Sequence, residues 1–203
     1  RRPPSTTHLP NTTLYRSSRK MGYALAEAAR DRGAAVTLIT TPTALIAITG
    51  VEMVQVHTTM QMKDAVVKAT AKTDALIMAA AVADYMPKTI AAQKIKKATV
   101  GLTLELVKTP DIISEVKGKF LKIGFAAETQ DLIANAKKKL INKGCDMFVA
   151  NDVSVKGTGF GADTNKVVII KKDGQLENLP LMTKREVADK ILDNVAKMLK
   201  GKK

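Results

Sequence analysis

The chain contains few of the residues on which disulfide, zinc and membrane chemistry depend. Among its 203 residues there are one cysteine, two histidines and no tryptophan, and aromatic residues make up 3% of the total. A single cysteine excludes an intramolecular disulfide, and together with two histidines it argues against a tetrahedral zinc site. Cys145 has no histidine near it in sequence, so we expect it to be buried rather than nucleophilic. No apolar run approaches the roughly 20 residues of a membrane-spanning helix, and we expect a cytoplasmic protein.

Acidic residues are also scarce relative to basic ones. There are 19 Asp and Glu against 33 Lys and Arg, so the formal net charge is +14. This excess indicates an anionic partner such as nucleic acid, a membrane surface or a phosphorylated small molecule. Surfaces that bind nucleic acid usually carry aromatic side chains among their basic residues, and these are missing here. We therefore expect no nucleic-acid or membrane partner, but solvated lysine faces and a phosphate-binding pocket.

The sequence lacks the glycine loops that commonly bind nucleotides. There is no G-x-x-x-x-G-K-[ST] motif, and no G-x-G-x-x-G motif opens a helix after a first strand. The stretch GTGFGA at 157–162 precedes a predicted strand, so we do not interpret it as a dinucleotide loop. An NAD-type Rossmann oxidoreductase and a basic nucleic-acid-binding module stay as alternatives. Nicotinamide titration would test the first, and the salt dependence of polyanion binding would test the second.

Short apolar strands alternate with helical patterns over most of the chain. Strands are expected at 34–40, 53–57, 74–82, 102–107, 122–128 and 146–152, and helices at 20–32, 58–72, 109–116 and 131–144. This alternation is typical of βαβ units and predicts an α/β fold, a Rossmann-like and mostly parallel sheet with helices on both faces. Residues 1–16 are rich in Pro, Thr and Asn and are expected to be irregular, which leaves residues 17–203 as a single domain.

The C-terminal part of the chain has a different pattern. Asp173 and Gly174 stand between two short runs and indicate a β-hairpin, and Thr183 with Glu186 predicts a capping box ahead of the last helix. A hairpin that projects from the sheet leaves an edge that a second copy of the chain can cover. We therefore expect residues 153–180 to form a projecting hairpin used in dimerisation.

Polar residues follow several predicted strands, at the end where open α/β sheets bind their ligands. They are Asp84, the segment from Lys108 to Asp111, Glu128, and the pair Asn151 and Asp152. We expect them to lie along one rim of the sheet and to form a site. A lone acid after a strand is more often a turn former or a helix cap, so the site hypothesis rests on the whole set.

Two features near this rim could hold phosphate. Thr109 is a candidate N-cap and Pro110 a candidate first helical residue, which would leave backbone N–H groups free at a helix N-terminus. Lys139 and Lys143 stand four residues apart, so they share a helix face and could hold a triphosphate by charge. A well-capped structural helix and a solvated lysine face explain the same residues, and the pattern leaves both interpretations open.

An ordered set of motifs runs through most of the chain. The motifs are SSRKMGYALAEAA, AAAVADYMP, KIKK, LVKTPDII, GFAAET, ANDVS and GFGADTNKVVII, and they cover roughly residues 17–200. Each motif is weak alone, but the ordered set resembles the phosphopantothenoylcysteine synthetase family, the phosphopantothenate–cysteine ligase of coenzyme A biosynthesis. In many bacteria this ligase is the C-terminal half of a bifunctional protein, fused behind a flavin-dependent decarboxylase.

The resemblance implies a two-step reaction that uses CTP and Mg²⁺. CTP activates the carboxylate of 4′-phosphopantothenate as an acyl-cytidylate and releases pyrophosphate. The amine of cysteine then attacks, giving 4′-phosphopantothenoylcysteine and CMP. Such chemistry depends on neutralising phosphate charge, which suits lysines and helix N-termini. The resemblance also implies a homodimer, and a decarboxylase domain fused or adjacent in the full-length protein.

Site residues are implied motif by motif. Nucleotide contacts are implied for Ala79, Ala80, Asp84, Lys94, Pro110, Asp111, Ile112, Ile113, Phe125, Lys139 and Lys143. Lys94, the first lysine of KIKK, matches the family's essential lysine, which stabilises charge around the α-phosphate and the acyl-cytidylate. Substrate contacts are implied more weakly for Asn151, Ser17 and Ser18, and no metal-ligating residue is implied.

The N-terminal motif departs from the family pattern. Tyr15 stands where the family has an asparagine that acts on the acyl-cytidylate, and Arg19 stands where it has a glycine. No first strand or GGT loop is visible either. We therefore predict that this chain binds CTP but is weak or inactive as a ligase, with a nucleotide-binding dimeric remnant as the alternative to an active enzyme.

Overall fold

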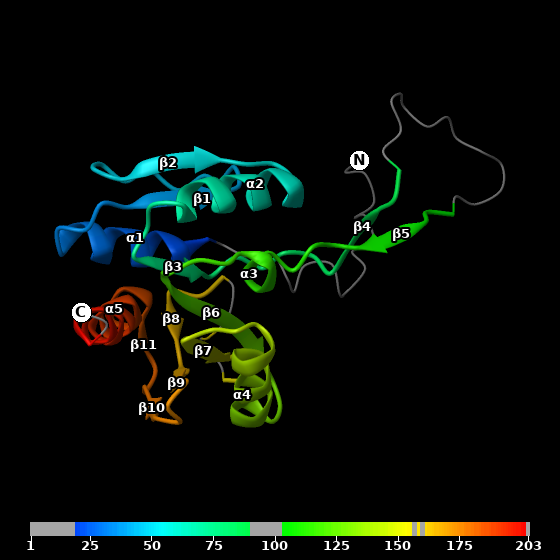
Figure 1. Ribbon diagram of the computed structural model, residues 1–203. Helices are drawn as coiled ribbons and strands as arrows, with labels where there is room; N and C mark the ends of the chain where they lie inside the picture. The colour runs from blue at the N-terminus through cyan, green and yellow to red at the C-terminus, as the bar shows by residue number, and fades with distance from the viewer. Residues whose placement is uncertain (1–18, 90–102, 156–157, 159–160, 202–203) are drawn as a thin grey trace, which may run out of the picture.

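The computed structural model of the chain describes residues 19–89, 103–155, 158 and 161–201 (Figure 1). Its central sheet has five strands in the order β10-β9-β7-β6-β3. These strands are β3 (Ala75–Met78), β6 (Leu121–Glu128), β7 (Met147–Asp152), β9 (Val167–Lys171) and β10 (Leu176–Asn178). β3, β6 and β7 run parallel to one another. β9 pairs antiparallel with β7, and β10 pairs antiparallel with β9.

Helices cover both faces of this sheet, as the alternating pattern predicted (Figure 1). They are α1 (Lys20–Asp31) and α5 (Lys184–Lys200) on one face and α4 (Leu132–Asn142) on the other. Leu25 of α1 shares a buried cluster with Val149 of β7, whereas Leu140 of α4 packs with Phe148 on the opposite face. No helix within the described ranges is both long and apolar enough to cross a membrane.

A separate pair of parallel strands lies outside the central sheet. β1 (Thr37–Thr40) pairs with β2 (Glu52–Gln55), and within the described part of the chain no backbone pairing joins them to β3. Helix α1 contacts both groups, because Tyr23 lies in the cluster against which Leu38 packs and Leu25 lies in the core of the central sheet. The sheet is therefore split between β1 and β3, and helix packing connects its two parts.

Side-chain caps begin two helices, and the second of them was predicted from the sequence. Thr58 Oγ1 accepts from the Gln61 N–H at 3.1 Å, and Gln61 Oε1 accepts from the Thr58 N–H at 3.2 Å, at the start of α2 (Thr59–Thr70). Ahead of α5, Thr183 and Glu186 form the same pair of bonds at 3.2 and 2.8 Å. Both capping boxes satisfy backbone N–H groups that a helix start leaves free.

A two-stranded antiparallel ribbon extends away from the rest of the molecule (Figure 1). It consists of β4 (Tyr85–Pro87) and β5 (Leu106–Lys108). The strand predicted over 74–82 ends at Met78, and the chain then runs without regular structure to the ribbon. This ribbon was not predicted from the sequence.

The helix predicted to begin at Thr109 starts later. α3 (Ile112–Glu115) is a single turn, and its N-cap is Asp111, whose carboxylate accepts from a first-turn N–H at 3.4 Å. Thr109 is engaged elsewhere: its hydroxyl donates to a carbonyl ahead of β4, and its N–H donates to the Asp84 carbonyl at 2.9 Å. The predictions of Thr109 as the N-cap and Pro110 as the first helical residue were wrong, because ribbon formation uses the polar groups of Thr109.

The predicted Asp-Gly hairpin forms, but within the central sheet. Gly174 has a φ of 91°, and Asp173 Oδ1 accepts from the Gln175 N–H at 3.0 Å, so a tight turn joins β9 to β10. Because β9 pairs directly with β7, the hairpin extends the sheet instead of projecting from it. The short strands β8 (Thr164–Asn165) and β11 (Met182–Thr183) pair beside it.

Cys145 and Gly124 lie in the tightly packed layer between β6 and α4. Cys145 is 2% exposed, and burial raises the pKa of its thiol to about 11, which confirms a core residue. A β-carbon at Gly124 would lie 2.5 Å from the ring of Phe148 and 3.2 Å from Cys145 Sγ. The glycine therefore allows the Phe148 ring to pack against the backbone of β6.

Candidate functional site

The carboxyl ends of β6 and β7 lie side by side at one edge of the central sheet. The register pairs Glu128 with Asp152 and Ala127 with Asn151. Asp84 follows the end of β3, with its carbonyl bound to the segment after β5 and its side chain exposed. The predicted rim of polar strand ends is thus present at β6 and β7.

Strand alternation divides the predicted site residues between the two faces of the sheet. Ala79 and Phe125 pack against the core that α1 and α5 cover, and Asn151 follows Val149 on that same face. Glu128 lies on the opposite face, where it contacts Lys139 of α4. The sequence predicted a common rim but not this division.

On the α4 face, both predicted lysines pair with carboxylates. Lys139 Nζ lies 2.5 Å from Oε1 of Glu128, and Lys143 Nζ lies 3.0 Å from Oδ2 of Asp111. Partial burial of Asp111 raises its pKa, but hydrogen bonds from Lys143 and Ser114 outweigh this effect and hold the pKa below its usual range. The ion pairs connect α4 to the end of β6 and to the start of α3.

An anion could bind these lysines by exchange with the carboxylates. The side chains of Lys139 and Lys143 are 42% and 30% exposed, so phosphate can approach them without opening the core. A phosphate oxygen would replace a carboxylate oxygen in a charged hydrogen bond of similar kind. Within the described ranges, no group of three or more His, Cys, Asp or Glu side chains is placed to hold a metal ion.

On the α1 face, Asn151 has a side-chain oxygen with no hydrogen-bond partner. Its Oδ1 is buried, and no other buried side-chain nitrogen or oxygen among the described residues is left unpaired. The register places Asn151 between Ala127 of β6 and Val167 of β9. Buried polar atoms nearly always have a partner, so this oxygen marks a position for a donor that the described chain does not supply.

Arg19 precedes α1 in a conformation that favours glycine. Its φ is 59°, and its Nε donates to Thr41 Oγ1 at 2.9 Å. The left-handed backbone gives a physical reason for the glycine that the family pattern has at this position. The predicted site residues Ser17, Ser18 and Lys94 lie outside the described residues.

The bonds that hold the starts of α1 and α5 to the segment before β9 were not predicted from the sequence. Lys20 Nζ lies 2.6 Å from Asp163 Oδ1, and the buried Lys184 donates to Asn165 Oδ1 at 3.0 Å. Asn165 Nδ2 in turn lies 3.7 Å from Met21 Sδ, and burial lowers the pKa of Lys184. The signal in the sequence was the motif GADTN, whose acid and amide make both contacts.

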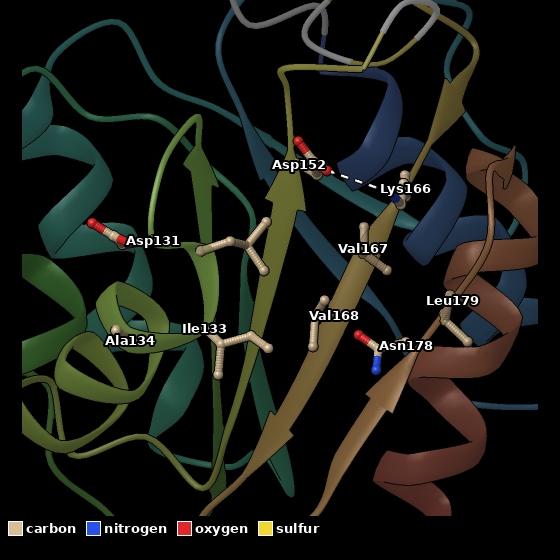
Figure 2. A pocket seen from close by; sticks show the side chains of 10 residues that line it. Asp131, Ile133, Ala134, Asp152, Lys166, Val167, Val168, Asn178 and Leu179 are labelled. Atoms are coloured by element: carbon tan, nitrogen blue, oxygen red, sulfur yellow. Dashed lines mark ion pairs between the residues drawn. The ribbon is translucent and has the colours of Figure 1, made fainter.

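A pocket of about 460 Å³ opens beside the start of α4 (Figure 2). It is lined by Asp131, Leu132, Ile133, Ala134, Asp152, Lys166, Val167, Val168, Asn178 and Leu179. Much of the lining is apolar, and Lys166 Nζ lies 3.6 Å from Asp152 Oδ2 at one end of it (Figure 2). None of the residues that the family resemblance implied lines this pocket.

Comparison with known proteins identifies the family. The model of the DNA/pantothenate metabolism flavoprotein C-terminal domain matches residues 12–199, and the chain belongs to this family. It is 47% identical over 189 residues to the coenzyme A biosynthesis bifunctional protein CoaBC of Bacillus subtilis (strain 168), an alignment that covers 91% of this chain and 47% of that protein. The CoaBC protein of Vibrio cholerae is 43% identical over 182 residues, which are 87% of this chain and 45% of the relative.

A solved structure gives the same result for the fold. The crystal structure of the C-terminal domain of CoaBC superposes with a TM-score of 0.77 at 41% identity, covering 91% of this chain and 85% of that one. The family resemblance and the fold class drawn from the sequence are thereby confirmed. The chain spans about half the length of the curated relatives it matches.

Proposed function

We propose that the chain is a CTP-dependent ligase that joins 4′-phosphopantothenate to cysteine in coenzyme A biosynthesis. The observation that carries this proposal is the edge formed by β6 and β7, with Lys139 and Lys143 on one face and the unpaired oxygen of Asn151 on the other. Membership of the family and relatives named for coenzyme A biosynthesis support it. An α/β sheet binds ligands at this edge, which fits a nucleotide.

In the proposed first step, a carboxylate oxygen of phosphopantothenate attacks the α-phosphorus of CTP. The bond from that phosphorus to the bridging oxygen breaks, and pyrophosphate leaves with the electron pair. Lys139 and Lys143 would leave Glu128 and Asp111 to neutralise the triphosphate and the departing pyrophosphate. Mg²⁺ would accompany the phosphates, as it commonly does in nucleotide-dependent enzymes.

In the proposed second step, the amine of cysteine attacks the acyl carbon of the cytidylate. The bond from the acyl carbon to the phosphate oxygen breaks, CMP leaves, and the attacking nitrogen loses a proton to solvent. Lys94 is the proposed catalytic residue, because a lysine beside the α-phosphate would stabilise charge in both steps. Asp84, the backbone at Ala79 and Ala80, and the segment 110–113 are the proposed walls of the nucleotide site.

A cytoplasmic homodimer is part of the same proposal, with the region 153–180 in its interface. Because the relatives are about twice as long as this chain, a flavin-dependent decarboxylase domain is the proposed neighbour in the full-length protein. The second candidate function is a nucleotide-binding dimer without ligase activity. The left-handed conformation of Arg19, at a position where the family has glycine, favours this candidate.

Pyrophosphate release is the experiment that tests the proposed function. The chain is incubated with CTP or ATP, with and without phosphopantothenate and cysteine, and product is followed by mass spectrometry. We expect weak release that requires CTP and phosphopantothenate, because the N-terminal motif departs from the family pattern at Tyr15 and Arg19. Lys94→Ala should abolish this release, whereas the matched variant Lys97→Ala should keep it. CTP binding without any release would favour the second candidate, and unchanged release by Lys94→Ala would overturn the role of Lys94.

A further inference from the structure

Asn151, whose Oδ1 is buried and unpaired, lies on the face of the sheet that carries aromatic and small apolar side chains. Phe125 lies on the neighbouring strand, on the same face and one alternation step from Ala127, the residue opposite Asn151. Ala79, the residue after β3, packs against the same core, and the buried Val167 lies across from Asn151 on β9. An aromatic ring, small side chains and a single buried acceptor are a combination that can bind the face and the N–H edge of a nucleobase.

The position of the acceptor adds a chemical requirement. An amide oxygen accepts a hydrogen bond but cannot donate one, so the ligand atom that meets Asn151 Oδ1 must carry hydrogen. Cytosine presents an exocyclic amine at the place where uracil presents a carbonyl oxygen. A carbonyl against Asn151 Oδ1 would bring two acceptors together, so a base with a carbonyl at this place binds only if the amide turns to present Nδ2. In the orientation that the structure shows, the site favours the amine.

From this geometry we infer that Asn151 is a specificity-determining residue, whose Oδ1 accepts a hydrogen bond from the exocyclic amine of the nucleotide base. The inference rests on the proposed function, because it assigns the base of the nucleotide to the α1 face of the sheet edge. It names the class of base that the site selects: one with an amino group in place of a carbonyl. Under the proposed function, the triphosphate binds Lys139 and Lys143 on the opposite face, which now pair with carboxylates.

Nucleotide binding without turnover tests this inference. Calorimetric titration of the native chain with CTP and UTP, in the presence of Mg²⁺ and without cysteine, should show CTP binding at least about tenfold tighter. Asn151→Ala and Asn151→Leu should weaken CTP binding by a similar factor and bring the CTP to UTP ratio close to one. Asn178→Ala, which removes an exposed amide from the edge strand, is the matched control and should keep the native ratio.

The melting temperature distinguishes a site residue from a structural one, because replacing a structural asparagine would lower it and replacing an unpaired site asparagine should raise it. Removing a buried polar atom that lacks a partner relieves a desolvation penalty, so Asn151→Leu should raise the melting temperature of the ligand-free chain. A site residue thus gains stability and loses CTP affinity on the same substitution. A lower melting temperature for both Asn151 variants, with an unchanged CTP to UTP ratio, would overturn the inference.

The outcomes separate this inference from the proposed function. If native chain binds CTP and releases pyrophosphate while the Asn151 variants keep the native base preference, the inference fails and the ligase proposal stands. If the variants lose base preference but the native chain forms no product, the inference stands and the ligase proposal fails. Failure of the native chain to bind any nucleotide would overturn both.

Discussion

The two faces of the sheet at the ends of β6 and β7 differ in how their polar side chains are paired. On the α4 face every charge named above has a partner, since Lys139 pairs with Glu128 and Lys143 with Asp111. On the α1 face the chain leaves Asn151 Oδ1 buried and unpaired. The lysine side chains are 42% and 30% exposed and can exchange one partner for another, although release of Glu128, whose side chain is 11% exposed, has a desolvation cost. A buried neutral acceptor has no partner to exchange and is costly to leave unpaired.

This difference indicates that the two faces contribute differently to ligand binding. A face that is already charge-balanced can bind an anion reversibly, because the anion takes the place of an existing carboxylate. A face with an unsatisfied acceptor gains a hydrogen bond that it cannot make without ligand, which is a basis for selectivity. The α4 face would therefore supply affinity for phosphate, and the α1 face would supply discrimination among bases.

The largest expected effect comes from removing the lysines of the α4 face. Lys139→Ala with Lys143→Ala should weaken CTP binding by about tenfold to a hundredfold, because two charge contacts to phosphate are lost and two carboxylates remain. The double variant Lys137→Ala, Lys138→Ala removes the same charge from exposed positions of the same helix and serves as the control. CTP affinity is measured by titration. If both double variants lose the same amount of affinity, the loss results from net charge alone and not from contacts of Lys139 and Lys143.

Gly124→Ala should disturb the α4 face through packing. The added carbon would lie 2.5 Å from the Phe148 ring, and overpacking of this kind destabilises folded proteins by about 1–3 kcal/mol. Urea unfolding measures the change, and Gly161→Ala, which meets no atom within 4 Å, is the control. An unchanged free energy of unfolding for Gly124→Ala would show that the Phe148 ring has room to move and that this face is loosely packed.

Arg19 offers a smaller test on the α1 side. Both Arg19→Gly and Arg19→Ala remove the guanidinium, so the difference between them reports the left-handed backbone. We expect the glycine variant to be more stable than the alanine variant by about 0.5–1 kcal/mol. Thermal unfolding of the pair decides this, and an alanine variant as stable as the glycine variant would mean that residue 19 adopts another conformation in solution.

The smallest expected effect concerns pH and the ion pair of Asp111. Its pKa is lower in the folded chain than in the unfolded chain, so its stabilising contribution is complete above the unfolded pKa and is lost as pH falls through the folded pKa. Asp111→Asn keeps an N-cap side chain and removes only the charge, at a cost of about a few tenths of a kcal/mol near neutral pH. In urea unfolding, the difference between the native chain and this variant should begin to shrink near the ordinary aspartate pKa of about 3.9 and vanish once the pH is below the folded pKa. A difference that stays constant with pH would assign it to capping.

Much of the fold follows from local patterns, and the exceptions have physical causes. The helix cap at Thr183 depends on Glu186, three residues away, so the sequence predicts it well. The start of α3 was missed because Thr109 bonds to Asp84 across the β4–β5 ribbon, a contact between segments far apart in sequence. The hairpin at Asp173 was predicted, but its membership of the central sheet depends on pairing between β7 and β9, which no local pattern encodes.

For the site, the sequence predicted the edge but not how its residues are distributed. Glu128 and Asn151 follow neighbouring strands, so a shared rim was predictable from the rule for open α/β sheets. Their placement on opposite faces depends on the exact register and length of β6 and β7, and a shift of one residue would exchange the faces. The contact of Lys20 with Asp163 joins residues that are 143 positions apart in sequence, and it had no local signal beyond the motif that contains the acid.

A crystal structure of the chain with CTP and Mg²⁺ would show whether the nucleotide contacts both faces of the sheet edge. We expect triphosphate oxygens within hydrogen-bond distance of Lys139 and Lys143, with Glu128 and Asp111 released from them. We also expect the exocyclic amine of cytosine on Asn151 Oδ1. Nucleotide bound elsewhere, for example in the pocket beside the start of α4, with both lysines still paired to their carboxylates, would contradict both expectations.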